Sequence, residues 1–480
     1  MGLRVVEVEV QTVPSFRTGL IDAPELAVGE IVSVSDPRID VLESSEIESF
    51  QKPISHFPII TVNGEPWHHA VSYLLEKATE FSSVSSSTLK GIAIDLALFL
   101  RWSIKNNVNY LECSRRPLSP IRLYRRSLLS EDYKPSTVTK KLSRLVSFYR
   151  WLQKERGIKF DFPLWEEQKV TIVSGGGNGK RILQNVKSTD VQRVPGSSHN
   201  SDNGFDGTIA DGARLTPYNK EEQKIIVRCL FEIGNTEMSL SFLIAIFTGA
   251  RLQTIFTLRE CNFSSPPNFE KPEQVLYVGA GWSKPNAKKE MVRSSELVDT
   301  KQSKRQKIFF PNWLYEKIQI YIASERYKNR KTKAQHDFIE PSEQYLFLTT
   351  RGKPYYCAKN DKHRIEYPEP PKGGSVHQFI EQQLRPRLLR KGFRSKFRFH
   401  NLRATYGMNI VRSWLPRIGE PGALTIGELF SYVRVRMNHS DIEVTQRYLD
   451  FDKNSQIAEF VQTEYEAYLD DLIGEVLESI

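Results

Sequence analysis

The chain has 480 residues, a formal net charge of +10 at pH 7 and a sequence pI of about 9.2. This length predicts about three domains at roughly 150 residues each, and the excess of cations among 11% aromatic residues favours a polyanionic partner such as nucleic acid. An ordinary basic protein would fit the charge alone equally well. The four cysteines stand far apart without a CxxC pair, which argues against a zinc site or disulfide framework and fits a reducing cytoplasm. No secretory signal opens the chain and no apolar run approaches 18 residues, so no membrane span is expected.

Residues 1–65 alternate and carry scattered prolines, which predicts an irregular or short-stranded N-terminal segment to which no function is assigned. Residues 66–165 predict a helical domain, because apolar residues recur at helical spacing from Leu89 to Leu100 and again from Val138 to Leu152. Cations on and before the second of these helices would suit contact with a DNA backbone, and solvated helix faces are the equally weighted alternative. The candidate DNA-binding residues here are Arg115, Arg116, Arg125, Arg126, Lys140, Lys141 and Arg144.

Residues 166–215 lack apolar periodicity and contain two glycine-rich stretches, which predicts a flexible linker or a long insertion. The glycines at 175–179 do not follow the GxxxxGK[ST] order of a phosphate-binding loop, so that interpretation is rejected.

Residues 216–450 predict a second domain that is mainly α, with helices at 221–248 and 313–324. Strands at 275–278 and 306–310 would form its one small antiparallel sheet.

Several residues of this second domain form a possible catalytic set. His400 and Arg403 are three residues apart and share a face if helical, while Arg251 follows a Gly-Ala step at a helix junction. His439 precedes Tyr448 by nine residues, about two and a half helical turns, so the two would face opposite ways on one unbroken helix. The segment is therefore expected to contain a turn, a short helix and a displaced tyrosine.

This set suits attack on a phosphodiester. Arginine guanidinium groups clamp the non-bridging oxygens of the pentacoordinate species, because they are permanently charged and bidentate. His400 would take or relay the phenolic proton, His439 would hydrogen-bond a non-bridging oxygen, and a lysine would protonate the departing 5′-oxygen. Lys301 is the first candidate for that lysine and Lys304 the second. No metal and no cofactor is required by this scheme.

The segments TGARLQTIFTL, FHNLRATYG and MNHSDIEVTQRYL resemble the signature segments of the tyrosine recombinases, the phage integrase family. The resemblance covers about residues 217–449 by motif, and the 66–165 bundle is similar to the family's core-binding domain only by order and pattern. It implies a helical core-binding domain followed by a tyrosine-recombinase catalytic domain. Arg251 and Arg403 would clamp the phosphate, His400 and His439 would assist, and Tyr448 would form a 3′-phosphotyrosyl bond. TKQSKRQKIFFP places Lys301 best at the family's β-hairpin lysine.

Three departures from the family pattern stand out. Thr254 occupies the position of a common acidic residue, Asn438 replaces the usual glycine, and the spacing from Arg403 to His439 is long. The resemblance implies a cytoplasmic, nucleoid-associated enzyme of a mobile genetic element. Its partners would be double-stranded DNA, further copies of the chain in a tetramer on DNA, and accessory DNA-bending proteins. The alternatives are a type IB topoisomerase or telomere resolvase, which share the chemistry, and a catalytically silent DNA-binding protein of the same fold.

Two further stretches flank the catalytic set. Residues 382–419 contain no acidic residue and carry Arg394, Lys396 and Arg398, which are candidates for DNA-backbone contact. Residues 451–480 reverse the charge and predict an acidic amphipathic helix, expected to dock on a neighbouring protomer or, nearly as plausibly, on its own domain.

Overall fold

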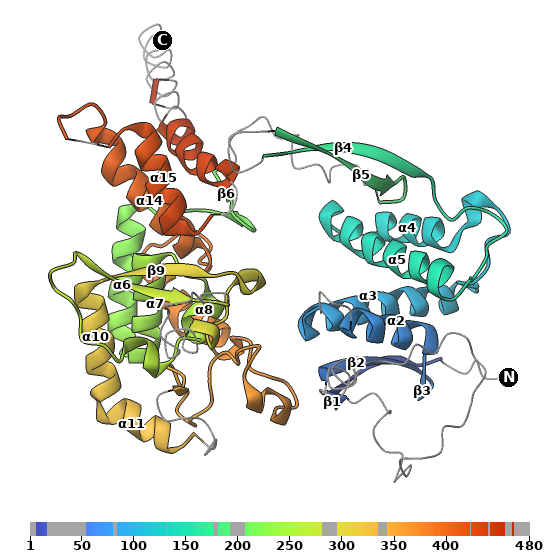
Figure 1. Cartoon of the computed structure of the whole chain (residues 1–480), viewed down its shortest axis with the longest axis horizontal. Helices are drawn as coiled ribbons and strands as arrows, with labels where there is room; N and C mark the ends of the chain where they lie inside the picture. Colours follow the sequence, from blue (N-terminus) through green and yellow to red (C-terminus); the bar gives the residue numbers. More distant parts are fainter. Residues whose placement is uncertain are drawn as a thin grey trace, which may run out of the picture. The chain divides into compact units, whose positions relative to one another are not determined.

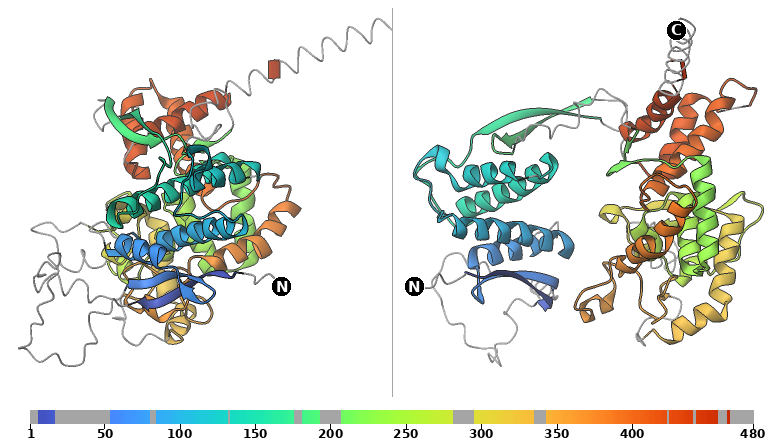
Figure 2. Two further views of the ribbon diagram at one scale, coloured as in Figure 1. Left: turned by 90° about the vertical axis from the view of Figure 1, so that its right-hand side faces the viewer. Right: turned by 180° about the vertical axis from the view of Figure 1, so that it is seen from behind.

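The computed structural model divides the chain into two compact units, drawn in Figure 1 and, from two further sides, in Figure 2. The first comprises Met1–Val173, Leu183–Ser201 and Ile365–Glu369, and the second comprises Ser174–Ile182, Asp202–Arg364 and Pro370–Ile480. The structure describes residues 6–16, 54–79, 84–131, 133–175, 181–192, 207–280, 295–334, 343–422, 424–439, 442–456 and 463–464. The prediction for the tail at 451–480 therefore lies largely outside the described residues.

The first unit begins with an antiparallel sheet. β1 (Val8–Phe16) pairs along its whole length with β2 (Ile54–Val62). β3 (Glu65–Pro66) pairs in turn with the C-terminal end of β2. The turn between β2 and β3 is Asn63-Gly64, both with positive φ, as a two-residue hairpin requires. The described parts of 1–65 thus form strands that share a core with the helices, which corresponds to the short-stranded alternative for this segment rather than the irregular one.

The described part of this unit also contains the α-helices α2 (His68–Thr79), α3 (Ser86–Lys105), α4 (Pro120–Ser130) and α5 (Pro135–Glu155). Proline stands at the first position of α4 and α5, where its missing N–H costs nothing. The sheet packs on α2 and α3, whose other side is covered by α4 and α5 (Figure 2). The expected stripes meet in this core, which includes Leu89, Leu96 and Leu142.

Two strand pairs fall in 166–215. β4 (Glu167–Gly175) pairs with β5 (Arg181–Thr189), and β6 (Ile209–Ala210) pairs with β7 (Arg214–Leu215) through a tight turn. The sequence predicted a linker or insertion here and did not identify strands. Strands of two residues are too short for an alternating pattern, so only the Asp211-Gly212 turn signal marks the second pair.

The second unit is built around α7 (Thr236–Thr248), which is buried on nearly all sides. Helices α6 (Lys220–Ile233), α8 (Leu252–Phe256), α10 (Asn312–Ala323) and α14 (Asn401–Trp414) pack on it, together with the hairpin of β8 (Glu273–Val278) and β9 (Gln306–Pro311). The hairpin is antiparallel and matches the two expected strands. Among the described residues, further α-helices of this unit are α11 (Glu325–Thr332), α12 (Gly374–Phe379), α13 (Arg385–Arg390) and α15 (Ile426–Met437), and α15 is followed by a helix over residues 442–456.

The mainly helical architecture with small antiparallel sheets confirms the predicted fold class. The expected helix at 221–248 is two helices, because Gly234 adopts the left-handed conformation that ends α6 and Asn235 caps α7. Within the described residues, no helix combines the length and apolar character that crossing a membrane would need.

Candidate active site

Arg251 is placed by a sharp change of direction at the end of α7. Gly249 follows the helix with φ of 65°, and a Cβ at this position would collide with the ring of Tyr406. Only glycine meets both conditions without strain. The chain then turns into α8, where Arg251 is the N-cap residue, so its guanidinium projects from the junction.

Arg403 lies on α14 one turn after His400, which stands at the helix N-terminus. Its side chain is almost fully buried, and each guanidinium nitrogen has a different acceptor. Nη1 donates to the Gly249 carbonyl at 2.8 Å, Nη2 donates to the Met437 carbonyl at 2.5 Å, and Nε donates to Asp211 Oδ2 at 2.7 Å. Two backbone carbonyls therefore fix the plane of the guanidinium and direct its Nε–H edge at Asp211.

His439 follows α15 through Asn438, which has φ of 50°. Asparagine tolerates this left-handed conformation better than other non-glycine residues. Its amide also accepts from Lys307 N at 3.0 Å and donates to Lys307 O at 2.8 Å, which ties the end of α15 to β9. The departure from glycine at this position therefore adds a connection that glycine would lack.

Tyr448 lies on the helix at 442–456, after the break that follows α15. The residue is 0% exposed, and its ring lies 5.6 Å from that of His439 between ring centroids. Its hydroxyl donates to Asp211 Oδ2 at 3.2 Å. The ring packs so closely on α14 that a Cβ added to Gly407 would lie 2.5 Å from Tyr448 Cε1.

Asp211, which the sequence reasoning did not identify, is the residue on which this set converges. Besides Arg403 and Tyr448, its Oδ2 accepts from His439 Nε2 at 3.2 Å, while Oδ1 lies 3.7 Å from an Arg251 Nη2. Asp211 also acts on His400, where its charge opposes the lowering of the histidine pKa by burial and by Arg403. Four predicted catalytic residues, Arg251, Arg403, His439 and Tyr448, thus surround one carboxylate, and His400 stands at the N-terminus of α14, one turn before Arg403.

The turn that carries Asp211 is held at its base. Ile209 and Leu215, paired across β6 and β7, are buried in the hydrophobic cluster that contains Tyr448, Met437 and Tyr406. The turn itself is closed by the Asp211 N–H, which donates to the Ala213 carbonyl at 3.0 Å. An Asp-Gly pair between apolar residues is a hairpin signal, and it was the one sequence feature that marked this segment.

Lys301 belongs to the short 3₁₀ turn Lys301–Ser303 before β9, where Gln302 and Ser303 both have positive φ. Its Nζ would be 3.5 Å from a Cβ on Gly212, so the amino group lies against the turn of the β6–β7 hairpin. Lys301 and Lys304 both line a hollow of about 500 Å³ together with Asp211, Arg251 and His439. Both candidate lysines are therefore at the site, and Lys301 is the one placed against the Asp211 turn.

The electrostatics of the site depend on burial and on Asp211. Burial alone would raise the pKa of Asp211, but its contacts with His439 and Arg403 outweigh this and hold the pKa far below its usual value. Burial, followed by the Asp211 charge, raises the pKa of Tyr448 well above its ordinary range. Burial and the Arg403 charge lower the pKa of Arg251 to about 10 and also lower the pKa of His400.

His439 is also shifted toward its neutral form. Burial lowers its pKa, and the opposing hydrogen bond to Asp211 does not fully compensate. A neutral ring accepts from Thr445 Oγ1 at Nδ1 over 3.0 Å and donates from Nε2 to Asp211, which assigns the tautomer. Among the residues that the structure describes, no three His, Cys, Asp or Glu side chains are grouped so as to hold a metal ion.

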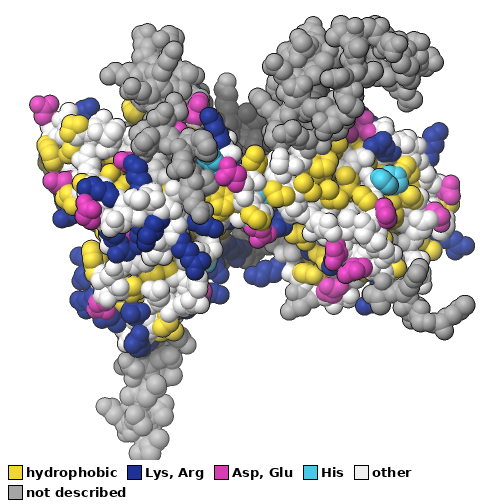
Figure 3. Space-filling view, turned by 90° about the horizontal axis from the view of Figure 1, so that it is seen from below, with side chains coloured by type: hydrophobic (Ala, Val, Ile, Leu, Met, Phe, Trp, Pro, Cys, Tyr) yellow, Lys and Arg dark blue, Asp and Glu magenta, His cyan; other side chains and the backbone are white. Residues whose placement is uncertain are grey.

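The predicted DNA-contact residues near this site are exposed. Arg394, Lys396 and Arg398 alternate with the buried Phe393, Phe397 and Phe399, so the cations face solvent while the aromatic rings anchor the segment. Lys and Arg side chains gather on the face of the second unit seen on the left of Figure 3.

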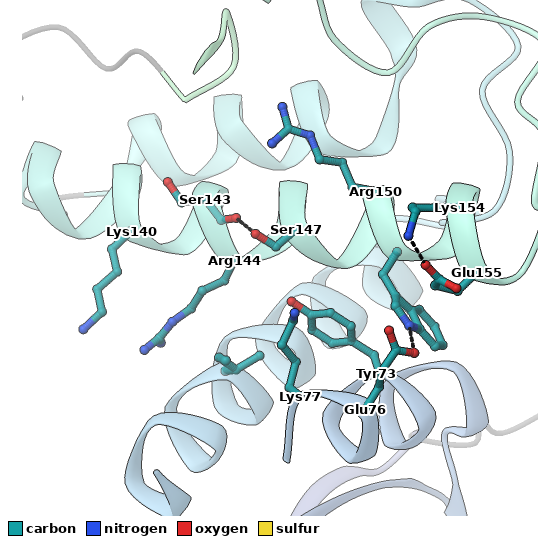
Figure 4. Close-up of a pocket in the computed structure, with 12 residues that line it drawn as sticks. Tyr73, Glu76, Lys77, Lys140, Ser143, Arg144, Ser147, Arg150, Lys154 and Glu155 are labelled. Atoms are coloured by element: carbon teal, nitrogen blue, oxygen red, sulfur yellow. Dashed lines mark hydrogen bonds and ion pairs between the residues drawn. The ribbon is translucent and has the colours of Figure 1, made fainter. Parts of the chain in front are cut away.

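In the first unit the predicted cations divide into two groups. Lys141 Nζ donates to Asp95 Oδ1 at 2.8 Å, and Arg144 is paired with the other oxygen of Asp95, so both join α5 to α3. Lys140 is exposed and lines a hollow of about 560 Å³ with Lys77 and Arg150 (Figure 4). Arg115, Arg116 and Arg126 are exposed, and Arg125 is half-buried.

Comparison with solved structures finds proteins described as recombinases and integrases. The XerA recombinase matches with 12% identity and a TM-score of 0.30 over 82% of this chain and 98% of that one. XerH site-specific recombinase bound to its difH substrate matches with 11% identity and a TM-score of 0.41, over 80% and 86% of the two chains. The Tn1549 transposon integrase in complex with circular intermediate DNA matches with 14% identity and a TM-score of 0.41, over 79% and 94%.

No family model matches the sequence. No curated protein matches it either. The function proposed below therefore rests on the geometry of the site.

Proposed function

We propose that this protein is a site-specific DNA recombinase or integrase that cuts and rejoins strands through a 3′-phosphotyrosyl intermediate. The observation that carries the proposal is the convergence of Arg251, Arg403 and His439 on one anionic group that also touches the Tyr448 hydroxyl, with His400 one turn before Arg403 on α14. Four separate segments of the chain supply these groups. A pocket of cations and hydrogen-bond donors around a buried phenol is suited to a phosphodiester.

The proposed reaction is a transesterification. The Tyr448 oxygen forms a bond to phosphorus, and the bond from phosphorus to the 5′-oxygen breaks. The phenolic proton passes to His400, whose lowered pKa leaves it neutral and able to accept a proton. Arg251 and Arg403 stabilise the added negative charge on the non-bridging oxygens, and His439 donates to one of them.

Lys301 is proposed to protonate the departing 5′-oxygen. Its amino group lies beside the Gly212 turn, at the edge of the hollow that contains Arg251 and His439. In the second half of the reaction a 5′-hydroxyl of a partner strand attacks the phosphotyrosine and Lys301 takes up its proton. The bond from phosphorus to the Tyr448 oxygen breaks, and His400 returns the proton to that oxygen. The energy of the broken bond is kept in the phosphotyrosyl ester, so no nucleotide hydrolysis is needed.

The exposed cations of both units are proposed to contact the DNA backbone. Arg394, Lys396 and Arg398 lead directly into His400, so phosphates bound there would be adjacent to the site. Exchange of strands between two duplexes requires several active sites, and we propose a tetramer on DNA, assisted by accessory DNA-bending proteins and acting in association with the nucleoid.

The test is the trapping of a covalent adduct. The full chain is incubated with a nicked duplex that carries its flanking attachment sequence, in EDTA, and the products are separated on a denaturing gel. We expect an adduct with the wild type, none with Tyr448→Phe, and a decrease of about 10²–10³ with Arg403→Ala. Tyr432→Phe, on the exposed face of α15, is the matched control and should form the adduct normally.

The outcomes separate the alternatives. DNA binding without any adduct would contradict the proposal and favour a silent DNA-binding protein. An adduct that reseals only on its own strand, with no exchange between paired sites, would favour an enzyme of the topoisomerase or telomere-resolvase type.

A further inference from the structure

Asp211 occupies the position that a substrate would need. Its Oδ2 is within hydrogen-bond distance of Arg403 Nε, His439 Nε2 and the Tyr448 hydroxyl at 2.7, 3.2 and 3.2 Å. These three groups are the clamp, the donor and the nucleophile of the proposed reaction. A phosphodiester placed for attack by Tyr448 would have to present a non-bridging oxygen to the same donors.

We propose that Asp211 is a tethered substitute for the scissile phosphate, which closes the active site of the DNA-free protein and is displaced when DNA binds. This inference rests on the proposed function for the identity of the displacing ligand. The anion-binding character of the pocket does not depend on it.

A carboxylate and a phosphodiester cannot share the pocket. Two like charges held this close in a largely buried pocket repel strongly, because little water screens them. The Nε–H of Arg403 and the Nε2–H of His439 are single donors that already point at Asp211. Exchange of one anion for the other instead keeps the charge balance of the site and restores every hydrogen bond.

The same contact keeps the nucleophile inactive. The Tyr448 hydroxyl donates to Asp211, and the carboxylate charge adds to burial in raising the pKa of the phenol. A carboxylate held this strongly by cations is a weak base, so it is a poor acceptor for the phenolic proton. Replacement of Asp211 by a phosphate would free the hydroxyl and bring its target to it in one step.

The anchoring of the hairpin indicates which part moves. Ile209 and Leu215 are buried in the Tyr448 cluster, so the base of the hairpin is fixed and the exchange is assigned to the turn at 211–213. Arg447, directly before Tyr448, donates from Nη1 to the Ala210 carbonyl at 2.8 Å on the protein surface. Loss of this hydrogen bond would loosen the turn without altering the pocket.

The presence of Asp211 in the pocket sets a minimum affinity that a competing ligand must have. A carboxylate tethered in the pocket competes at high effective concentration, so a small anion must bind against it. DNA reaches the site with many other backbone contacts, which offset the cost of displacing Asp211. The free protein is therefore expected to bind inorganic phosphate weakly and DNA well.

The test uses inorganic phosphate and needs no DNA site. The wild-type full chain is compared with Asp211→Asn, which retains the size of the side chain and removes its charge, by calorimetric titration with phosphate and by melting with and without phosphate. Asp450→Asn makes the same charge change at an exposed position on the helix that carries Tyr448 and is the matched control. We expect Asp211→Asn to bind phosphate at least about tenfold more tightly than the wild type and to be stabilised by it. Asp450→Asn should behave as the wild type.

Phosphate affinity unchanged in Asp211→Asn would overturn the proposal. If Asp211→Asn does not fold, Arg447→Ala replaces it, and tighter phosphate binding by that variant is the expected result. The trapping assay gives the second measurement. Asp211→Asn should form adduct at least as fast as the wild type. A loss of about 10²-fold or more would identify Asp211 as a required catalytic group and reject its role as a substitute for the phosphate. Absence of adduct in every protein, wild type included, would reject the proposed function. The phosphate titration would still decide whether Asp211 occupies the anion-binding pocket.

Discussion

Arg403 Nη1 donates to the carbonyl oxygen of Gly249 at 2.8 Å, which joins two motifs that are far apart in the sequence. Gly249 thus has two roles. Its left-handed backbone directs the chain to Arg251, and its carbonyl holds the second arginine of the pocket. The two guanidinium groups are positioned relative to each other through one residue.

Substitution of Gly249 by alanine should therefore damage both stability and chemistry. The new Cβ would be strained at φ of 65° and would collide with the Tyr406 ring. We expect a loss of about 2–4 kcal/mol in the free energy of unfolding, from strain and overpacking together, and loss of the covalent adduct. Gly234→Ala is the matched control, because Gly234 ends α6 at φ of 70° with nothing within 4 Å of the added Cβ. Urea unfolding of both variants separates strain from collision, and equal losses would argue against a collision at Gly249.

Gly407 offers a way to displace the nucleophile without removing it. A Cβ here would lie 2.5 Å from Tyr448 Cε1 and 3.2 Å from Met437 Cε. Gly407→Ala should cost about 1–3 kcal/mol of stability through overpacking and should slow adduct formation by moving the phenol. Gly427→Ala, within α15 and with nothing within 4 Å, should instead gain about 0.5–1 kcal/mol from improved helix propensity. Normal adduct formation by Gly407→Ala would contradict the packing described for Tyr448.

Asn438 tests the connection between α15 and β9. Asn438→Gly retains the left-handed conformation but loses both hydrogen bonds to Lys307. Since two part-exposed hydrogen bonds are lost, we expect about 1–2 kcal/mol of destabilisation, measured by urea unfolding. Adduct formation should fall because Asn438 precedes His439 and Lys307 lies on the strand that follows the Lys301 turn. Without the Asn438–Lys307 hydrogen bonds these two parts of the site are no longer joined. Asn438→Asp retains the accepting oxygen and should be intermediate, and a glycine variant as active as the wild type would show that this connection is dispensable.

Two of the residues that the sequence predicted for the site have positions that depend on their own local backbone. Arg251 lies two residues after Gly249 and His439 directly after Asn438, and both preceding residues have positive φ, so a short motif contains the information that places each side chain. Asp211 is different, because a two-residue strand pair has no usable periodicity and its role arises only from packing against the Tyr448 cluster. The short-stranded alternative for 1–65 did not define the bounds or pairing of β1 for a similar reason, since its partner β2 is distant in sequence and the pairing has no local signature.

Two histidines, the buried His439 and the half-buried His400, should make stability depend on pH. The pKa values of His400 and His439 are lowered, mainly by burial, so the unfolded chain binds more protons than the native state as the pH falls below about 6.5. Stability should therefore be full above that value and decline on acidification. We expect the melting temperature to fall between about pH 7.5 and pH 5.5, and to fall less in the double variant His400→Asn, His439→Gln. His68→Gln, at an exposed position, should retain the wild-type slope, and an unchanged slope in the double variant would contradict the assignment.

Lys140 and Lys141 are neighbours in sequence with opposite surroundings, so the two alanine variants should differ in kind. Lys141 is 8% exposed and ion-paired with Asp95, so Lys141→Ala should cost about 1–3 kcal/mol of stability by removing a partner of a buried carboxylate. Lys140 is exposed beside the hollow of Figure 4, so Lys140→Ala should leave stability unchanged and weaken DNA binding. Because one phosphate contact would be lost, the slope of log affinity against log salt should fall by about one unit. Gel-shift titrations at several salt concentrations, with urea unfolding of the same samples, measure both effects. A salt slope altered by Lys141→Ala and not by Lys140→Ala would mean that Lys141, and not Lys140, contacts DNA. It would also contradict the interpretation of the hollow beside Lys140 as a DNA-contact surface.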